Sequence, residues 1–255
     1  MRVWMKLMLV SLVTIPMVAQ VQSPAAGAAQ AQPAQAAKPA MDPCEAMRKK
    51  LDDWPQLGRY ADANASLSAT QLGRVVFYGD SITDAWTRDG GTFFPGKPYV
   101  NRGISGQTTE QMVVRFRQDV INLYPQTVVI LAGTNDIAGN TGPETLEQIE
   151  DNLASMADLA HANGIRVALC SILPAFDYPW QPGLTPAPKI DAVNTWLKAY
   201  AADHGYIYVD YHTAMKDTRD GLPANLSKDG VHPLPAGYTV MAPLAQAAID
   251  KALGQ

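Results

Sequence analysis

Cysteine is scarce in this chain, with only two among 255 residues. Two cysteines cannot build a multi-bridge disulfide framework or a four-cysteine zinc site, so both are excluded. No run of about 18 apolar residues occurs, so we expect no membrane-spanning helix and no stable membrane insertion. An excess of basic charge is also lacking, because the net charge is −4. This argues against a nucleic-acid partner, which would need a basic face for the phosphates.

Acidic residues are absent from residues 1–41. Arg2 and Lys6 precede a short apolar run over residues 7–19, and small residues follow it. A basic start, a short apolar stretch and small residues after it predict a secretory signal peptide over 1–22. An uncleaved interfacial helix is the alternative. The signal peptide predicts an exported protein that is periplasmic or secreted.

Residues 23–42 are dominated by Ala, Gln and Pro. Such a segment buries too little apolar surface to offset its ordering entropy, so it predicts a flexible linker. We expect residues 43–255 to form one domain. Cys44 and Cys170 could pair in an oxidising compartment, but Cys170 ends an apolar run where a buried free thiol is ordinary. The sequence leaves the pairing open.

Short apolar, β-branched runs alternate with longer stretches in which apolar residues have helical spacing. The expected strands are 75–78, 99–101, 127–131, 165–169 and 206–209. The expected helices are about 108–123, 146–159, 190–205 and 235–253. Strands that are apolar on both faces favour a parallel sheet covered by helices on both sides. In such sheets ligands bind outside the carboxyl ends of the strands, so polar residues that follow strands are candidates for a site.

Polar motifs occur at these expected strand ends and near the C-terminus. They are Gly79-Asp80-Ser81, Gly103-Ile104-Ser105-Gly106, Gly133-Thr134-Asn135-Asp136 and Asp229-Gly230-Val231-His232. Each motif alone has an ordinary structural explanation as a turn or a helix cap. Their combination is more informative than any one of them.

Together the motifs supply the groups that acyl transfer needs. A serine hydroxyl becomes a good nucleophile when a base takes its proton, which predicts Ser81 as nucleophile and His232 as base. Asp229 stands three residues before His232 and could fix its tautomer. The backbone N–H groups of Ser81 and Gly106 and the side-chain amide of Asn135 could form an oxyanion hole. The sequence therefore predicts a serine hydrolase.

In this order, over residues about 73–235, the four motifs resemble the blocks of the SGNH hydrolases, also called GDSL esterases and lipases. The spacing is most similar to the branch of the platelet-activating-factor acetylhydrolase catalytic subunits and small bacterial acylhydrolases. Ile82 stands where that family has its leucine, an apolar exchange that leaves the nucleophile argument intact. The resemblance implies a three-layer α/β/α sandwich with a five-stranded parallel sheet. It also implies a carboxylic ester hydrolase that needs no metal or other cofactor.

An aromatic, proline-rich segment over residues 174–182 follows the fourth expected strand and should overhang the crevice. Its rings Phe176, Tyr178 and Trp180 are the predicted substrate contacts. Further rings expected on the same rim are Phe93, Phe94 and Tyr99. Export and an aromatic rim favour an ester of a short acyl group, such as acetyl on an extracellular carbohydrate. A lipid ester is an open alternative.

Three further functions stay open at this stage. A lysophospholipase or thioesterase could use the same groups, and a secreted carbohydrate-binding module could use the aromatic rim without catalysis. A metallohydrolase is less favoured, because no two histidines have the His-x-x-x-His or His-Glu-x-x-His spacing. The remaining histidine that follows a strand, His212, is interpreted as structural.

Overall fold

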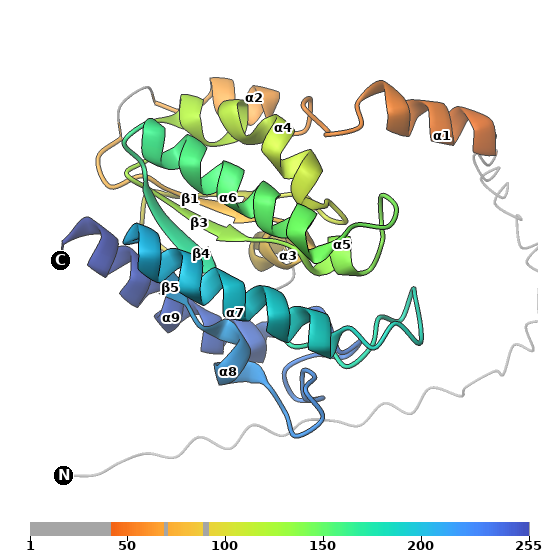
Figure 1. Cartoon of the computed structure of the whole chain (residues 1–255). Helices are drawn as coiled ribbons and strands as arrows, with labels where there is room; N and C mark the ends of the chain where they lie inside the picture. The colour runs from red at the N-terminus through yellow and green to blue at the C-terminus, as the bar shows by residue number, and fades with distance from the viewer. Residues whose placement is uncertain (1–41, 69–70, 89–91, 255) are drawn as a thin grey trace, which may run out of the picture. The chain divides into compact units, whose positions relative to one another are not determined.

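The computed structural model describes residues 42–68, 71–88 and 92–254. The predicted signal peptide over 1–22 and the predicted linker, except for Asp42, lie outside the described residues. Within the described ranges, no helix is long and apolar enough to cross a membrane. The described helices and strands begin at Pro43 (Figure 1).

A parallel sheet forms the centre of this part of the chain. Its strands are β1 (Val75–Gly79), β2 (Tyr99–Gly103), β3 (Thr127–Leu131), β4 (Arg166–Cys170) and β5 (Ile207–Val209). The five strands are all parallel and lie in the order β2-β1-β3-β4-β5. The predicted five-stranded parallel sheet is therefore confirmed. The last two strands begin one residue later than the sequence pattern predicts.

Helices cover both faces of this sheet. The longer ones are α3 (Ser81–Arg88), α4 (Thr109–Asp119), α6 (Leu146–Ala162), α7 (Ala187–His204) and α9 (Pro235–Leu253). The shorter or peripheral ones are α1 (Pro43–Asp52), α2 (Ala61–Ala65), the 3₁₀ turn η1 (Ile121–Leu123), α5 (Thr134–Ile137) and α8 (Tyr211–Met215). Figure 1 shows α4 and α6 on one side of the sheet and α9 on the other. The predicted three-layer α/β/α sandwich is confirmed.

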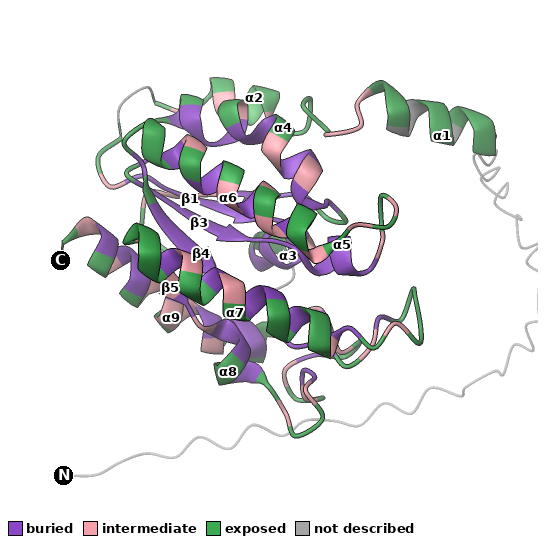
Figure 2. Cartoon of the chain, in the orientation of Figure 1, coloured by how far each residue is buried: buried purple, intermediate pink, exposed green. Residues whose placement is uncertain are grey.

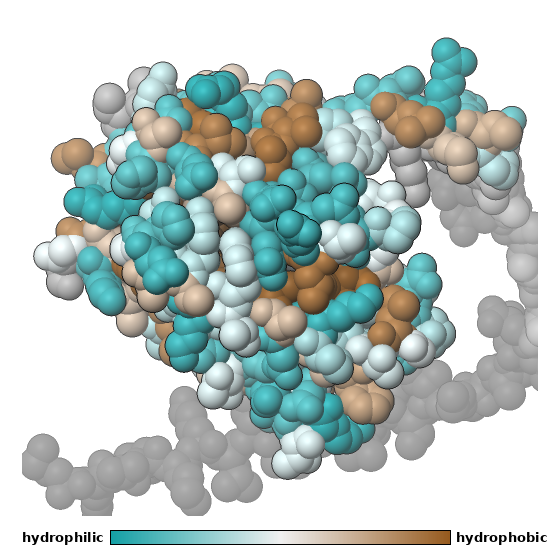
Figure 3. All heavy atoms as spheres, viewed as in Figure 1, coloured by the Kyte–Doolittle hydropathy of each residue, from teal (hydrophilic) through white to brown (hydrophobic). Residues whose placement is uncertain are grey.

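The core follows the pleat of the strands. Val76 and Tyr78 belong to the apolar cluster beneath α4, α6 and α7, whereas Val75 and Phe77 belong to the cluster beneath α3 and α9. Successive strand residues point to opposite faces, so strands that are apolar throughout feed two cores at once. The central strands are accordingly buried (Figure 2). On the viewed face, hydrophilic residues cover much of the outer surface (Figure 3), while the buried apolar residues of the helices belong to the two clusters against the sheet.

An aromatic cluster corrects one expectation about the rim. Phe93 and Phe94 pack against Phe77 with ring centroids 5.1 Å and 5.0 Å away, and Tyr99 lies 5.3 Å from Phe94. Tyr99 also opens β2, at the opposite end of the strand from Gly103. Aromatic rings gain more from burial against one another than from exposure. These rings are therefore partly buried against the core beneath α3 and α9, and their predicted place on the substrate rim is wrong.

The two cysteines do not form a disulfide. Cys170 ends β4 and is buried, and this burial raises the pKa of its thiol to about 12. Cys44 lies in α1 with an exposed side chain. The structure thus supports the interpretation of Cys170 as a small buried hydrophobe.

Candidate active site

Ser81 is placed by a tight turn from β1 into α3. β1 ends at Gly79, and α3 begins at Ser81. A Cβ at Gly79 would lie 2.2 Å from Thr83 Oγ1 and 2.6 Å from the Leu131 carbonyl oxygen, so only glycine fits this close approach. The Asp80 carboxylate accepts a 2.9 Å hydrogen bond from the Ile82 N–H and holds the first turn of the helix. The Ser81 hydroxyl consequently stands at the carboxyl end of the sheet.

His232 and Asp229 approach Ser81 from a loop before α9. Ser81 Oγ lies 3.0 Å from His232 Nε2, and His232 Nδ1 lies 2.6 Å from Asp229 Oδ2. The other Asp229 oxygen accepts hydrogen bonds from the backbone N–H groups of Val231 (3.0 Å) and His232 (2.8 Å) and from the Ser227 hydroxyl (3.0 Å). The local turn thus aims the carboxylate at the imidazole, and the three side chains form one hydrogen-bonded row.

The charge on Asp229 is well stabilised. Partial burial by itself raises the pKa of Asp229, but the hydrogen bonds from His232 and Val231 outweigh burial and lower the pKa to about 2. The carboxylate therefore stays ionised at neutral pH and holds the Nδ1–H of the imidazole. This leaves the lone pair of Nε2 free to take a proton from Ser81.

The predicted oxyanion donors lie in the same place. Ser81, Gly106, Asn135 and His232 all line one cavity of about 490 Å³. Gly106 has a φ of +82°, a conformation that favours glycine. The buried Asn135 amide donates a 2.9 Å hydrogen bond to the Gln107 carbonyl, which leaves its second N–H for a ligand. All the residues predicted for the nucleophile, the base and the oxyanion hole are brought together.

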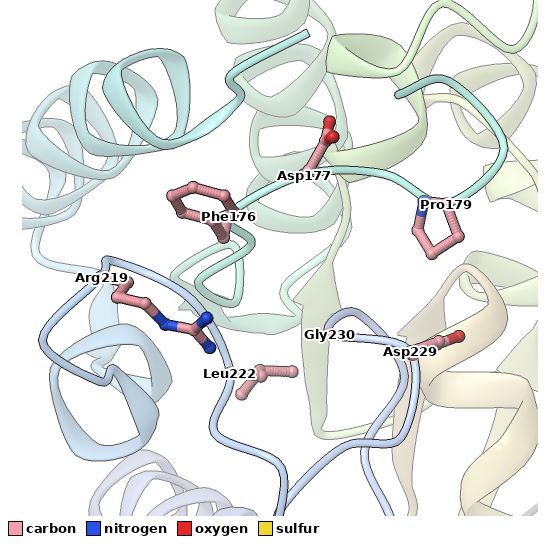
Figure 4. Close-up of a pocket in the computed structure, with 7 residues that line it drawn as sticks. All are labelled: Phe176, Asp177, Pro179, Arg219, Leu222, Asp229 and Gly230. Carbon is pink, nitrogen blue, oxygen red and sulfur yellow. The ribbon is translucent and has the colours of Figure 1, made fainter. Parts of the chain in front are cut away.

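The three rings of the aromatic segment lie in three different environments. Trp180 lines the cavity of Ser81, with its ring centroid 6.0 Å from that of His232. Tyr178 is fully buried beneath Trp180, and its hydroxyl lies 2.9 Å from Thr134 Oγ1. Phe176 is exposed, with the Arg219 guanidinium 5.7 Å from its ring centroid, and both residues line a neighbouring cavity of about 220 Å³ (Figure 4). Of the three predicted substrate contacts, only Trp180 shares the cavity of Ser81, and burial corrects the prediction for Tyr178.

A buried arginine that sequence reasoning missed supports the site. Arg115 of α4 is fully buried and donates to the carbonyl oxygens of Gly79 (3.0 Å) and Arg102 (2.9 Å). It pairs with Asp119 at 3.1 Å, one helical turn later. Arg115 therefore ties the carboxyl end of β1 to that of β2, from which the Ser81 turn and the Gly106 loop begin. The sequence feature that could have indicated this ion pair is an Arg and an Asp four residues apart beside the apolar face of a predicted helix.

Asp136 and Glu144 form a second feature that the sequence did not indicate. Asp136 Oδ1 accepts hydrogen bonds from the backbone N–H (2.8 Å) and the hydroxyl of Thr109, whereas Asp136 Oδ2 and Glu144 Oε2 are buried with no hydrogen-bond donor among the described residues. Burial raises the pKa of both carboxyls, and the Asp136 charge raises the pKa of Glu144 further. We expect the two carboxyls to hold one proton, which supplies the donor that these oxygens lack.

Replacing Glu144 by glutamine should raise the melting temperature at pH 8 and leave it nearly unchanged at pH 5. The folded pair holds its proton more tightly than the unfolded chain, so its stabilising effect is present at low pH and is lost as the pH rises. The glutamine side-chain amide would donate to Asp136 at every pH. Thermal unfolding of both proteins at the two pH values measures the difference. Glu147→Gln, an exposed acid on α6, is the control for loss of one charge, and an equal rise there would contradict the shared proton.

The other histidines lie away from this site. His212 is buried, with its Nε2 3.5 Å from Asp191, and burial lowers the pKa of its imidazole. His161 and His204 line a separate cavity near the amino ends of β4 and β5. Among the described residues, no three His, Cys, Asp or Glu side chains are grouped as a metal site.

A serine, a histidine and an aspartate in one hydrogen-bonded row at the carboxyl end of a parallel sheet are the arrangement that serine hydrolases use for acyl transfer. The chain belongs to the GDSL-like lipase/acylhydrolase family, whose model matches residues 77–240. The family predicted from the four sequence motifs is thereby confirmed.

Similar proteins agree with this assignment. The solved structure of a GDSL-like lipase from Bacteroides thetaiotaomicron is 45% identical with a TM-score of 0.76, and the match covers 78% of this chain and 99% of that one. An acetylxylan esterase of Geobacillus stearothermophilus is 25% identical over 197 residues, which are 66% of this chain and 90% of the relative. The esterase TesA of Pseudomonas aeruginosa is 30% identical over 138 residues, 52% of this chain and 60% of the relative. The protein is a carboxylic ester hydrolase.

Proposed function

We propose that this protein is a serine esterase that hydrolyses short-chain acyl esters, with Ser81 as nucleophile, His232 as base and Asp229 as the group that orients the base. The observation that carries the proposal is the row from Ser81 Oγ through His232 to Asp229, with distances of 3.0 Å and 2.6 Å. Both distances are within hydrogen-bond reach, as proton transfer requires.

The reaction follows from this row in two balanced steps. His232 Nε2 takes the hydroxyl proton while Ser81 Oγ bonds to the ester carbonyl carbon. The protonated imidazole then gives that proton to the alcohol oxygen as the ester bond breaks, which leaves an acyl group on Ser81. Water attacks the acyl group with the same proton relay, and the carboxylic acid and free serine are released.

Replacing Asn135 by alanine should lower kcat by about 10²–10³-fold with little change in KM, because an oxyanion donor acts on charge that develops only in the transition state. Asn135 lines the cavity of Ser81, and one of its two amide N–H groups donates to Gln107 while the other is left for the oxyanion. Steady-state kinetics on a soluble aryl acetate measure the split. Asn135→Asp should be worse, since it places a carboxylate beside the forming oxyanion. A raised KM with unchanged kcat would instead make Asn135 a binding residue.

For the substrate we propose an acetyl or similarly short acyl group on an extracellular carbohydrate. Trp180 supports a carbohydrate alcohol, because it is partly exposed in the same cavity as Ser81 and offers a flat apolar face to a sugar ring. The acetylxylan esterase relative is consistent with this choice. A hydrolysis panel that varies acyl length and alcohol separately, with Ser81→Ala as blank, tests the proposal. Preference for long acyl chains or thioesters would favour the lysophospholipase or thioesterase function.

Two further assays separate hydrolysis from binding and serine chemistry from metal chemistry. Binding of acetylated oligosaccharide without Ser81-dependent hydrolysis would favour a carbohydrate-binding module. Loss of hydrolysis after EDTA treatment, restored by metal, would favour a metallohydrolase, whereas we expect full activity without any cofactor. The predicted export from residues 1–22 is tested separately, by following the full chain into the periplasm or medium of its producing cell.

A further inference from the structure

Asn140 stands at the edge of the cavity that contains Ser81, and both ends of its amide are used. Its Nδ2 donates to Asn135 Oδ1 at 2.9 Å and lies 3.3 Å from the Gly106 carbonyl oxygen. Its Oδ1 accepts a 3.1 Å hydrogen bond from Trp180 Nε1. One side chain thus contacts the residues of two proposed oxyanion donors and the aromatic wall of the cavity.

The chemistry of these partners decides which way each amide points. The Trp180 indole can only donate, so the oxygen of Asn140 must face it. The NH₂ group of Asn140 then faces Asn135, which must present its own oxygen there. The Asn135 NH₂ group is consequently directed to the Gln107 carbonyl and the cavity. If Asn135 turned over, its oxygen would face the position where negative charge forms.

We propose that Asn140 is a positioning residue for ester hydrolysis, which keeps the Asn135 amide in the orientation that stabilises the oxyanion and, through the Gly106 carbonyl, restrains the loop that carries the Gly106 N–H. The inference rests on the proposed function of Asn135 and Gly106 as donors. The Trp180 indole N–H in turn fixes Asn140, so the wall of the cavity and the oxyanion hole are joined by one chain of hydrogen bonds. Rigid orientation of donors before the reaction is what makes such a hole effective.

Asn140→Ala should lower kcat about 10-fold with little change in KM, less than loss of Asn135 itself, because the Gln107 carbonyl still restrains the Asn135 amide. Asn140→Asp keeps the shape but replaces the NH₂ donor by an oxygen that repels Asn135 Oδ1 and the Gly106 carbonyl. Its kcat should fall further, by about 10²-fold. Trp180→Phe keeps a ring but removes the N–H, and its kcat should fall less than that of Asn140→Ala.

The double variant Asn135→Ala/Asn140→Ala tests whether Asn140 acts through Asn135. Residues that share one hydrogen-bond network give losses that do not add, so the second substitution should have a much smaller effect in the absence of Asn135. Thr141→Val is the matched control, because Thr141 follows Asn140 in the same loop and its hydroxyl contacts Thr108 and Glu144 instead. This control should keep the kcat of the parent protein.

The assay of the parent protein separates the two proposals. If it hydrolyses no acetate ester, or if Ser81→Ala hydrolyses it equally well, the proposed function fails, whatever Asn140 does. If the parent protein is an active Ser81-dependent esterase, the inference about Asn140 is overturned by unchanged kcat in Asn140→Ala and Asn140→Asp. A loss of kcat in Thr141→Val as large as that in Asn140→Ala would also overturn the inference. Fully additive losses of kcat in the double variant would do the same.

Discussion

Replacing Ser81 by alanine is expected to lower kcat by about 10⁴-fold or more while the fold survives. The substitution removes the hydroxyl that lies within hydrogen-bond reach of His232, at 3.0 Å from Nε2. Alanine is a good helix former, so α3 can still begin at this position. Steady-state kinetics on an aryl acetate measure the loss, and circular dichroism checks the fold.

Covalent labelling gives a second measurement of the same prediction. An organophosphonate should add to Ser81 in the parent protein and to no serine in Ser81→Ala. Ser105→Ala is the matched control, because Ser105 lines the same cavity but donates its hydroxyl to Asp84 at 2.6 Å. Labelling at Ser81 should persist in this variant. Labelling at Ser105 or Ser171 in the parent protein would refute Ser81 as nucleophile.

Replacing His232 by alanine should have an effect as large as that of Ser81→Ala, because nucleophile and base act as one unit. Asp229→Asn should have a smaller effect, since the imidazole would keep its place near Ser81 while losing the carboxylate on Nδ1. The working imidazole must be neutral, so its protonation in acid should lower kcat/KM.

A pH–rate profile over about pH 5–8 tests this assignment. The pKa of Asp229 is lowered to about 2, so this carboxylate stays ionised across that range and cannot cause the fall. The residual kcat/KM of Asp229→Asn should still fall at acid pH. The residual kcat/KM of His232→Ala should not show this fall. A flat profile of the parent protein would count against a histidine base.

Local sequence patterns determined the fold and the core of the site. β-branched runs such as Thr127–Leu131 and helical spacing such as that in α6 depend on neighbouring residues, so they are readable without a structure. Parallel strands place their carboxyl ends at one edge of the sheet, which is why Ser81, Gly106 and Asn135 could be expected to meet. The pairing of Asp229 with His232 was readable too, because the two residues stand three positions apart in one turn.

Only the tertiary structure decided which residues surround Ser81, His232 and Asp229. Neighbouring aromatic residues in a loop follow no period, and the packing of other elements buried Tyr178 while leaving Trp180 in the cavity. Arg115 meets the carbonyl oxygen of Gly79 across 36 residues, and Trp180 meets Asn140 across 40. Such contacts depend on how separate loops and helices approach one another in space. A single sequence gives the chemistry of each side chain, but tertiary packing determines which side chains contact one another.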